Sequence, residues 1–69
     1  MIIDWPYAPK WAIAAAQDED GRWYYYGKVP RPGFTGWLFR GKRSRFIKLT
    51  EPNADWRETL ILRPIEENE

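Results

Sequence analysis

The stretch that decides the fold is Trp11-Ala-Ile-Ala-Ala-Ala-Gln-Asp-Glu-Asp-Gly-Arg-Trp-Tyr-Tyr-Tyr-Gly-Lys-Val29. Two runs rich in apolar side chains flank the segment Asp18-Glu-Asp-Gly21, and Asp-Gly favours a hairpin turn because glycine tolerates a positive φ. The second run, residues 22–29, is rich in the aromatic residues that fit a pleated sheet. The first run, residues 11–17, could form a helix by the propensity of its alanines, but it is short and leads directly into the turn. We therefore expect the two runs to pair as a β-hairpin.

The number of residues in the turn decides which side chains share a face of this hairpin. With an even number, one face carries Ala12, Ala14 and Ala16 opposite Trp23, Tyr25 and Val29. The other face then carries Trp11, Ile13, Ala15 and Gln17 opposite Arg22, Tyr24, Tyr26 and Lys28. The first face combines small residues with large ones, as a packed interior requires. We therefore expect Trp23 and Tyr25 in the core, and we keep Tyr24 and Tyr26 as candidates for a functional surface.

The rest of the chain predicts a second hairpin and one helical turn. Pro30, Pro32 and Gly33 are expected to interrupt the first sheet ladder. Residues 36–40 and 45–49 have strand character and flank the turn at 41–44, so we expect them to pair with each other. Near the C-terminus, Asp55 and Glu58 have the spacing of a capping box, which predicts a short helical turn over residues 56–60 that ends by Pro64.

These elements predict one domain, residues 1–69, with a frayed acidic tail at 66–69. The expected fold is mostly β, a small α+β arrangement in which an antiparallel sheet of about four strands comes from two hairpins. A domain of this size buries only about 60% of its unfolded surface. Five tryptophans, four tyrosines and three phenylalanines are available for the core, and aromatic rings bury large areas.

The side chains needed for common catalytic and metal sites are missing from the sequence. It contains no cysteine and no histidine, which excludes disulfides, the usual zinc sites and Cys- or His-based nucleophiles. Ser44 is the only serine, and no histidine is present to activate it. A calcium loop counted from Asp18 would place Arg22 and Val29 where oxygen ligands are needed, so a turn is the better interpretation. We expect no enzyme activity, no catalytic residue, no cofactor and no metal.

Charge is strongly segregated along the chain. Residues 22–48 contain eight basic residues and no acidic one, whereas both flanking segments are net acidic. The same middle segment holds eight of the twelve aromatic residues. The densest part is Arg40-Gly-Lys-Arg-Ser-Arg45, with aromatic residues on both sides. Basic segments of this kind are often solvated turns, but they also bind acidic proteins or nucleic acids.

The candidate partner-binding residues combine cations of this segment with rings that could contact a ligand. Cations can neutralise phosphates or carboxylates, and flat rings can stack on bases or anchor a protein interface. The set is Arg40, Lys42, Arg43, Arg45, Trp37, Tyr24, Tyr26 and Lys28.

Nothing in the sequence directs the chain to a membrane. The longest uninterrupted apolar stretch, residues 11–16, is far shorter than the ~20 residues of a spanning helix. Asp4 and Pro6 stand where a signal peptide would be apolar. We expect a cytosolic protein with no membrane partner.

Three groups of residues carry a resemblance to other proteins. They are Trp5-x-x-Ala8-Pro9-x-Trp11-Ala12, then Asp18-x-Asp20-Gly21-x-Trp23-x-x-Tyr26 with Trp37, and finally Asp55-Trp56-x-x-Thr59-Leu60-x-x-Arg63-Pro64. On these residues the chain resembles a group of small tailed-phage and prophage accessory proteins of unknown function. The group is expected to have serine where Thr59 stands, and it offers no catalytic residues to transfer. The resemblance implies a viral protein that acts in the host cytoplasm, where such proteins often inhibit host enzymes or defence complexes.

The leading hypothesis is a non-enzymatic protein that binds, and inhibits, a host bacterial protein or defence complex through a basic aromatic surface. The alternative is direct binding of single-stranded nucleic acid by the same residues. A structural role in the virion is a further alternative, and homo-oligomerisation stays open.

Overall fold

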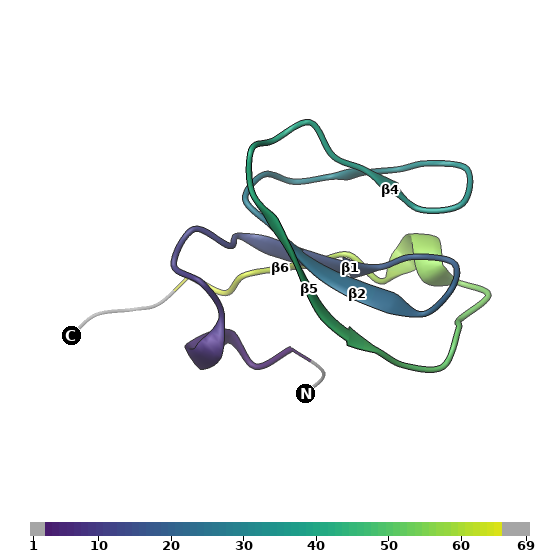
Figure 1. Ribbon diagram of the computed structural model, residues 1–69, viewed down its shortest axis with the longest axis horizontal. Helices are drawn as coiled ribbons and strands as arrows, with labels where there is room; N and C mark the ends of the chain where they lie inside the picture. The colour runs from purple at the N-terminus through teal and green to yellow at the C-terminus, as the bar shows by residue number, and fades with distance from the viewer. Residues whose placement is uncertain (1–2, 66–69) are drawn as a thin grey trace.

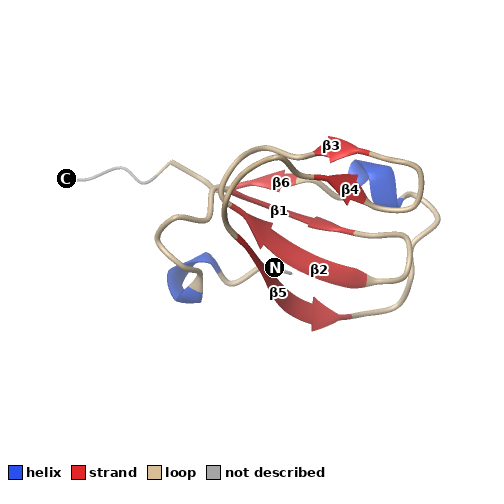
Figure 2. Ribbon diagram, turned by 45° about the horizontal axis from the view of Figure 1, so that its top comes forward, coloured by secondary structure: helices blue, strands red, loops and turns tan. Residues whose placement is uncertain are grey.

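The computed structural model describes residues 3–65, which form a four-stranded antiparallel sheet and a separate two-stranded sheet (Figures 1 and 2). The four-stranded sheet has the order β5-β2-β1-β6, and β3 pairs only with β4. This confirms the predicted mostly β, antiparallel fold. The predicted tail at 66–69 lies outside the described residues. The elements are η1 (Trp5–Tyr7), β1 (Ala14–Gln17), β2 (Arg22–Tyr26), β3 (Arg31–Pro32), β4 (Trp37–Leu38), β5 (Ser44–Leu49), η2 (Trp56–Glu58) and β6 (Ile61–Leu62).

The predicted first hairpin is confirmed as β1 and β2, so the alanine run is a strand over residues 14–17. The backbone N–H of Asp18 donates to the carbonyl of Arg22 at 2.8 Å, and that of Gly21 donates to the carbonyl of Asp18 at 3.0 Å. Gly21 has a φ of +97°, and a Cβ there would lie 2.2 Å from the Thr50 carbonyl oxygen. Only glycine fits this turn.

The predicted assignment of hairpin faces is wrong because the turn is odd. The Asp18–Arg22 pair leaves three residues, 19–21, in the loop. Ala14 therefore lies opposite Tyr26, and Ala15 opposite Tyr25. One face carries Ala14, Ala16, Tyr24 and Tyr26, and the other carries Ala15, Gln17, Trp23 and Tyr25. Trp23 and Tyr25 are nevertheless in the core as expected.

The predicted second hairpin does not form. Instead, β4 pairs with β3, and β5 pairs with β2. After Leu38, the ring of Phe39 packs against Tyr26 with their centroids 5.0 Å apart, so the chain turns toward the sheet and does not double back on β4. Pro32 lies within the β3–β4 pair without breaking it. Both strands of a two-stranded sheet are edge strands, and an edge strand tolerates the N–H that proline lacks.

Both faces of the four-stranded sheet are covered by aromatic side chains. On one face the N-terminal segment contributes Ile3 and Trp5 to a cluster with Ala15, Trp23 and Tyr25. On the other face the two-stranded sheet and η2 contribute Trp37 and Trp56 to a cluster with the alanines and tyrosines of the hairpin. The alanines of β1 leave room for rings on both sides, because large rings pack best against small neighbours.

A buried glutamine connects β1 to three later segments. Gln17 is almost fully buried, and its Nε2 donates to Thr50 Oγ1 at 3.0 Å and to the Glu51 carbonyl at 2.9 Å. Trp37 Nε1 donates to the Gln17 carbonyl at 2.8 Å. The Gln17 backbone N–H donates to Thr59 Oγ1 at 2.9 Å. These bonds satisfy buried polar groups and fix the loop after β5, β4 and η2 against the sheet.

Two arginines hold loops by bonding to backbone carbonyls. The Arg63 guanidinium donates to the carbonyls of Pro9 and Ala12 at 2.9 and 2.8 Å, which ties the N-terminal segment to β6. Arg57 donates to the carbonyls of Gly33 and Phe34 and lies 4.3 Å from the centre of the Trp56 ring. The side chains of Arg57 and Arg63 therefore stabilise the fold through these hydrogen bonds.

The helical turn near the C-terminus is confirmed as the 3₁₀ helix η2, but its predicted capping box is not formed. Asp55 makes no side-chain cap. Thr59 Oγ1 instead donates to the Trp56 carbonyl at 2.6 Å and closes the turn. Within residues 3–65, no helix has the length and apolar character needed to cross a membrane.

Candidate functional site

The basic residues of the middle segment fall into two groups. Arg22 pairs with the Asp20 carboxylate, with 2.5 Å between Nη1 and Oδ2, and Lys48 also interacts with the protein. The side chains of the other six make no hydrogen bond or ion pair with residues 3–65. Unpaired cations are available to a ligand. They are Lys28, Arg31, Arg40, Lys42, Arg43 and Arg45.

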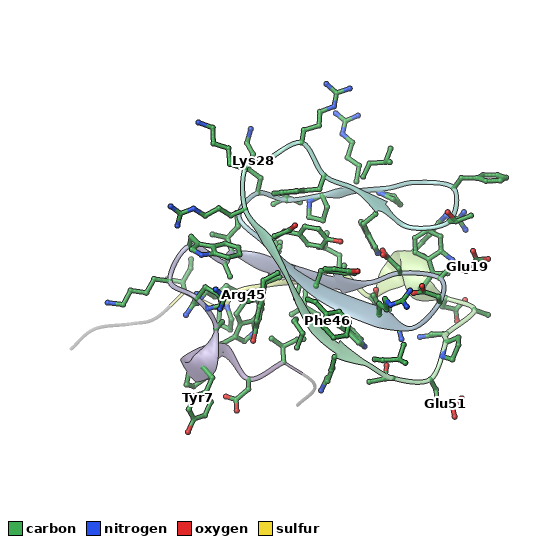
Figure 3. The ribbon with its side chains drawn as sticks, in the orientation of Figure 1. Tyr7, Glu19, Lys28, Arg45, Phe46 and Glu51 are labelled. Atoms are coloured by element: carbon green, nitrogen blue, oxygen red, sulfur yellow. The ribbon has the colours of Figure 1, made fainter. Side chains whose placement is uncertain are left out.

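The fold gathers these unpaired cations at one end of the molecule. The end of β2, the residues after β4 and the start of β5 lie at this end (Figures 1 and 2), and Arg31 at the start of β3 lines the same pocket as Lys28 and Arg40. Figure 3 shows Lys28 and Arg45 there, while Glu19 and Glu51 lie at the opposite end. The segregation of charge along the sequence thus becomes a separation in space, which can orient an approaching anionic partner.

A groove of about 570 Å³ lies among these residues, and we call it the basic groove. Three cations line it together with three aliphatic side chains that are 43–62% exposed. Its size falls within the range of about 300–1,000 Å³ that is typical of ligand sites. The lining offers ammonium, guanidinium and alkyl groups but no carboxylate, so it suits an anion with apolar parts. Its residues are Ile13, Lys28, Val29, Arg31, Leu38 and Arg40.

Two of the predicted site residues, Lys28 and Arg40, line the basic groove. The predicted cations Lys42, Arg43 and Arg45 are exposed and follow the groove along the chain, and we call residues 41–45 the basic turn. Sequence reasoning missed four lining residues, Ile13, Val29, Arg31 and Leu38. Arg31 was visible as part of the basic segment, whereas the aliphatic residues carried no signal of their own.

The structure buries two of the three aromatic residues of the predicted site. Trp37 is only 9% exposed and Tyr26 only 4%. Trp37 packs edge-on against Trp56, and Tyr26 packs against Phe39, because both point from their strands into the core between the two sheets. Neither can present its ring to a partner. Tyr24 is half-buried between Tyr26 and Phe46, with ring centroids 6.3 and 5.7 Å away.

Burial raises the pKa of three side chains, all outside the basic groove. Two of them are the Tyr25 and Tyr26 hydroxyls. Burial also raises the pKa of Asp18, although the Trp37 backbone N–H, which donates to Asp18 Oδ1 at 3.0 Å, acts in the opposite direction. Asp18 therefore holds the start of β4.

The turn between β1 and β2 carries carboxylates of the kind that bind metal ions, but Asp18 and Asp20 already bond to other residues of the protein. Asp18 accepts from Trp37, and Asp20 accepts from the side chain and backbone of Arg22. In the part of the chain that the structure describes, no three acidic side chains come together in a group that could hold a metal ion.

The geometry of the basic groove is therefore the main guide to function. Its lining has no pair of groups suited to acid–base or nucleophilic chemistry, and its cations suit binding. Comparisons with protein-family models, with curated proteins and with solved structures find no match for this chain.

Proposed function

We propose that this protein is a small non-enzymatic binding protein that captures an acidic segment of a partner protein in the basic groove and the basic turn. One observation carries the proposal. Six cations have no side-chain partner among residues 3–65, and three of them share a groove with three exposed aliphatic side chains. A protein segment with carboxylates and aliphatic side chains would satisfy both kinds of group.

The composition of the groove favours a protein over single-stranded nucleic acid. Proteins that bind single strands stack bases on exposed aromatic rings. Trp37 and Tyr26 are buried, and the exposed rings of Phe34 and Phe46 do not line the groove. Aliphatic side chains offer no flat surface for stacking, but they do fit the aliphatic side chains of a protein.

The resemblance to small phage accessory proteins supports a host bacterial protein as the partner. In this proposal the protein acts in the host cytoplasm and inhibits an enzyme or defence complex by occupying an acidic surface. Its charged end would raise the rate of encounter, because opposite charges steer association.

Affinity purification from expressing bacteria tests this function. Arg40→Glu is compared with Lys10→Glu, because both residues are exposed and both changes alter net charge equally, but only Arg40 lines the groove. We expect one specific protein to copurify with the wild type and with Lys10→Glu but not with Arg40→Glu. Nuclease treatment should not remove this protein from the wild-type sample. Nucleic acid that copurifies in place of a protein would contradict the proposal and support the alternative.

A further inference from the structure

Strand β5 forms one edge of the four-stranded sheet and is six residues long (Figure 2). The opposite edge, β6, has only two residues and is followed by Pro64. Proline and short length are devices that protect a sheet edge from pairing, and β5 has neither. Residues 44–46 of β5 are exposed.

The register shows which backbone groups of β5 are available. The Gly27 N–H donates to the Arg43 carbonyl at 2.9 Å, so Arg43 faces β2. Bonding residues alternate along an antiparallel pair, and Arg45 lies opposite Tyr25, so Arg45 also faces β2. Ser44 and Phe46 therefore direct their N–H and C=O groups away from the sheet. The bulge in this pair lies beyond Phe46, so residues 43–46 form a regular edge.

The two faces of this edge differ in chemistry. Arg45 lies on the face of Tyr25, and Arg43 projects to the same side by alternation. Phe46 lies on the other face, where its ring packs edge-on against Tyr24 and remains 50% exposed. A strand added to this edge would place its alternate side chains beside the arginines and beside Phe46.

The arginines argue against a second copy of this chain as the added strand. Antiparallel pairing of two copies centred on Arg45 would place Arg45 against Arg45, and pairing centred on Ser44 would place Arg43 against Arg45. Like charges directly opposite each other destabilise a sheet. The same charges favour a strand that carries acidic residues.

We propose that β5 accepts an extended acidic segment of a partner as a fifth strand, which pairs with the outward backbone groups of Ser44 and Phe46. The segment alternates acidic residues, which face Arg43 and Arg45, with apolar residues, which pack beside Phe46. This inference rests on the proposed function, because it names the conformation and pattern of the acidic partner segment. Main-chain bonds supply affinity in such strand addition, and alternate side chains supply specificity.

A synthetic peptide tests the pattern. The probe is a fluorescein-labelled peptide of about eight residues, within the usual length of a strand, in which Glu and Val alternate. Its control has the same composition with Glu and Val in two blocks. By fluorescence anisotropy we expect the alternating peptide to bind at least about tenfold more tightly, because only it can place every carboxylate on the arginine face. Equal affinities would overturn the proposed pattern.

Ser44→Pro tests strand addition. Proline removes the outward N–H of Ser44 but no bond to β2, whereas Ser44→Ala keeps that N–H. We expect a loss of about tenfold in affinity for the alternating peptide with Ser44→Pro and no loss with Ser44→Ala. A folded Ser44→Pro variant that keeps wild-type affinity would overturn the inference.

Amide hydrogen exchange provides a readout that needs no variant. The amides of Ser44 and Phe46 should exchange fast in the free protein and become protected when the alternating peptide binds. If both stay unprotected in the complex, strand addition is wrong. Peptide binding that is lost in Arg40→Glu but kept in Ser44→Pro would contradict the inference and leave the proposed function standing. A dimer that Ser44→Pro converts to monomer would identify a second copy as the occupant and also contradict it.

Discussion

The two ends of the four-stranded sheet use their charged residues differently. At the end with the β1–β2 turn, Asp20 pairs with Arg22, Asp18 accepts from the Trp37 backbone, and Arg57 holds the loop between β3 and β4. At the opposite end, six cations have no side-chain partner within the described residues, and three of them line the basic groove. Charges that bond to the chain contribute to folding, whereas unpaired charges are available for a partner. Substitutions at the two ends should therefore affect different properties.

The largest expected loss of stability comes from a substitution of Trp37, and its neighbour on the same strand, Leu38, provides the comparison. Trp37 is buried and bonded to Gln17, whereas Leu38 is 62% exposed and lines the groove. Trp37→Ala should cost about 3–5 kcal/mol of stability, because it leaves a large cavity between the two sheets. Leu38→Ala should change stability by about 0.5 kcal/mol or less. Urea denaturation measures both, and equal losses would show that β4 does not direct alternate side chains to core and groove.

A smaller loss is expected for Gln17→Leu, which has a similar size but no hydrogen-bonding side chain. In a partly buried setting, the Glu51 carbonyl would lose the Nε2 donor and Thr50 Oγ1 would keep only the Trp23 Nε1 donor. An unsatisfied buried polar group costs about 1–3 kcal/mol. We expect a reduction of this size in the free energy of unfolding, measured by denaturation in urea. A variant as stable as the wild type would mean that the loop after β5 is not held by Gln17.

The pH dependence of stability should report on Asp18. Its pKa is raised from 3.8 mainly by burial, so the folded state binds its proton more tightly than the unfolded state. The contribution of Asp18 to stability is therefore greatest below pH 3.8 and is lost as pH rises through the raised pKa. Asp18→Asn should keep the oxygen that accepts the hydrogen bond from the Trp37 N–H. Because an amide does not ionise, the variant should not lose this stability as pH rises.

The measurement is a set of urea denaturation curves for the wild type and Asp18→Asn between about pH 3 and pH 7. We expect the stability of the variant relative to the wild type to increase as pH rises. A relative decrease would show that the bond from the Trp37 N–H to the carboxylate outweighs the cost of burying its charge.

The first hairpin could be predicted from sequence because its turn is encoded locally by Asp20 and Gly21. The size of the turn could not, because it depends on a distant contact: Gly21 accepts a hydrogen bond from the Thr50 N–H at 2.9 Å. An error of one residue in the loop changed which side chains of the two strands share a face, and it placed Tyr26 among the candidates for a surface.

The basic residues of the candidate site could be predicted from the sequence, but the groove that they line could not. The segregation of basic residues identified Lys28 and Arg40 without any knowledge of the fold. The groove also needs Ile13, which precedes β1, and Leu38, which belongs to the second sheet. Trp37 bonds the two-stranded sheet to the hairpin and Arg57 bonds it to η2, and such long-range bonds leave no local pattern in the sequence.

The double variant Lys42→Glu with Arg43→Glu should have the smallest effect on stability. It is also the sharpest test of the cationic end of the molecule. Both side chains are exposed and make no bond with any described residue, so the free energy of unfolding should change by about 0.5 kcal/mol or less. Surface plasmon resonance with the captured partner should show slower association and weaker salt dependence, because exposed charges act mainly on encounter.

The matched variant for this test is Leu38→Ala, which lies in the groove and carries no charge, and which should mainly raise the dissociation rate. A single-stranded nucleic acid partner would behave differently. Its log affinity would fall with log salt by about 0.7 per neutralised phosphate, and the double variant would lose about two such contacts. A double variant that associates with its partner at the wild-type rate would show that the basic turn is only a solvated loop, and the binding role would then belong to the groove alone.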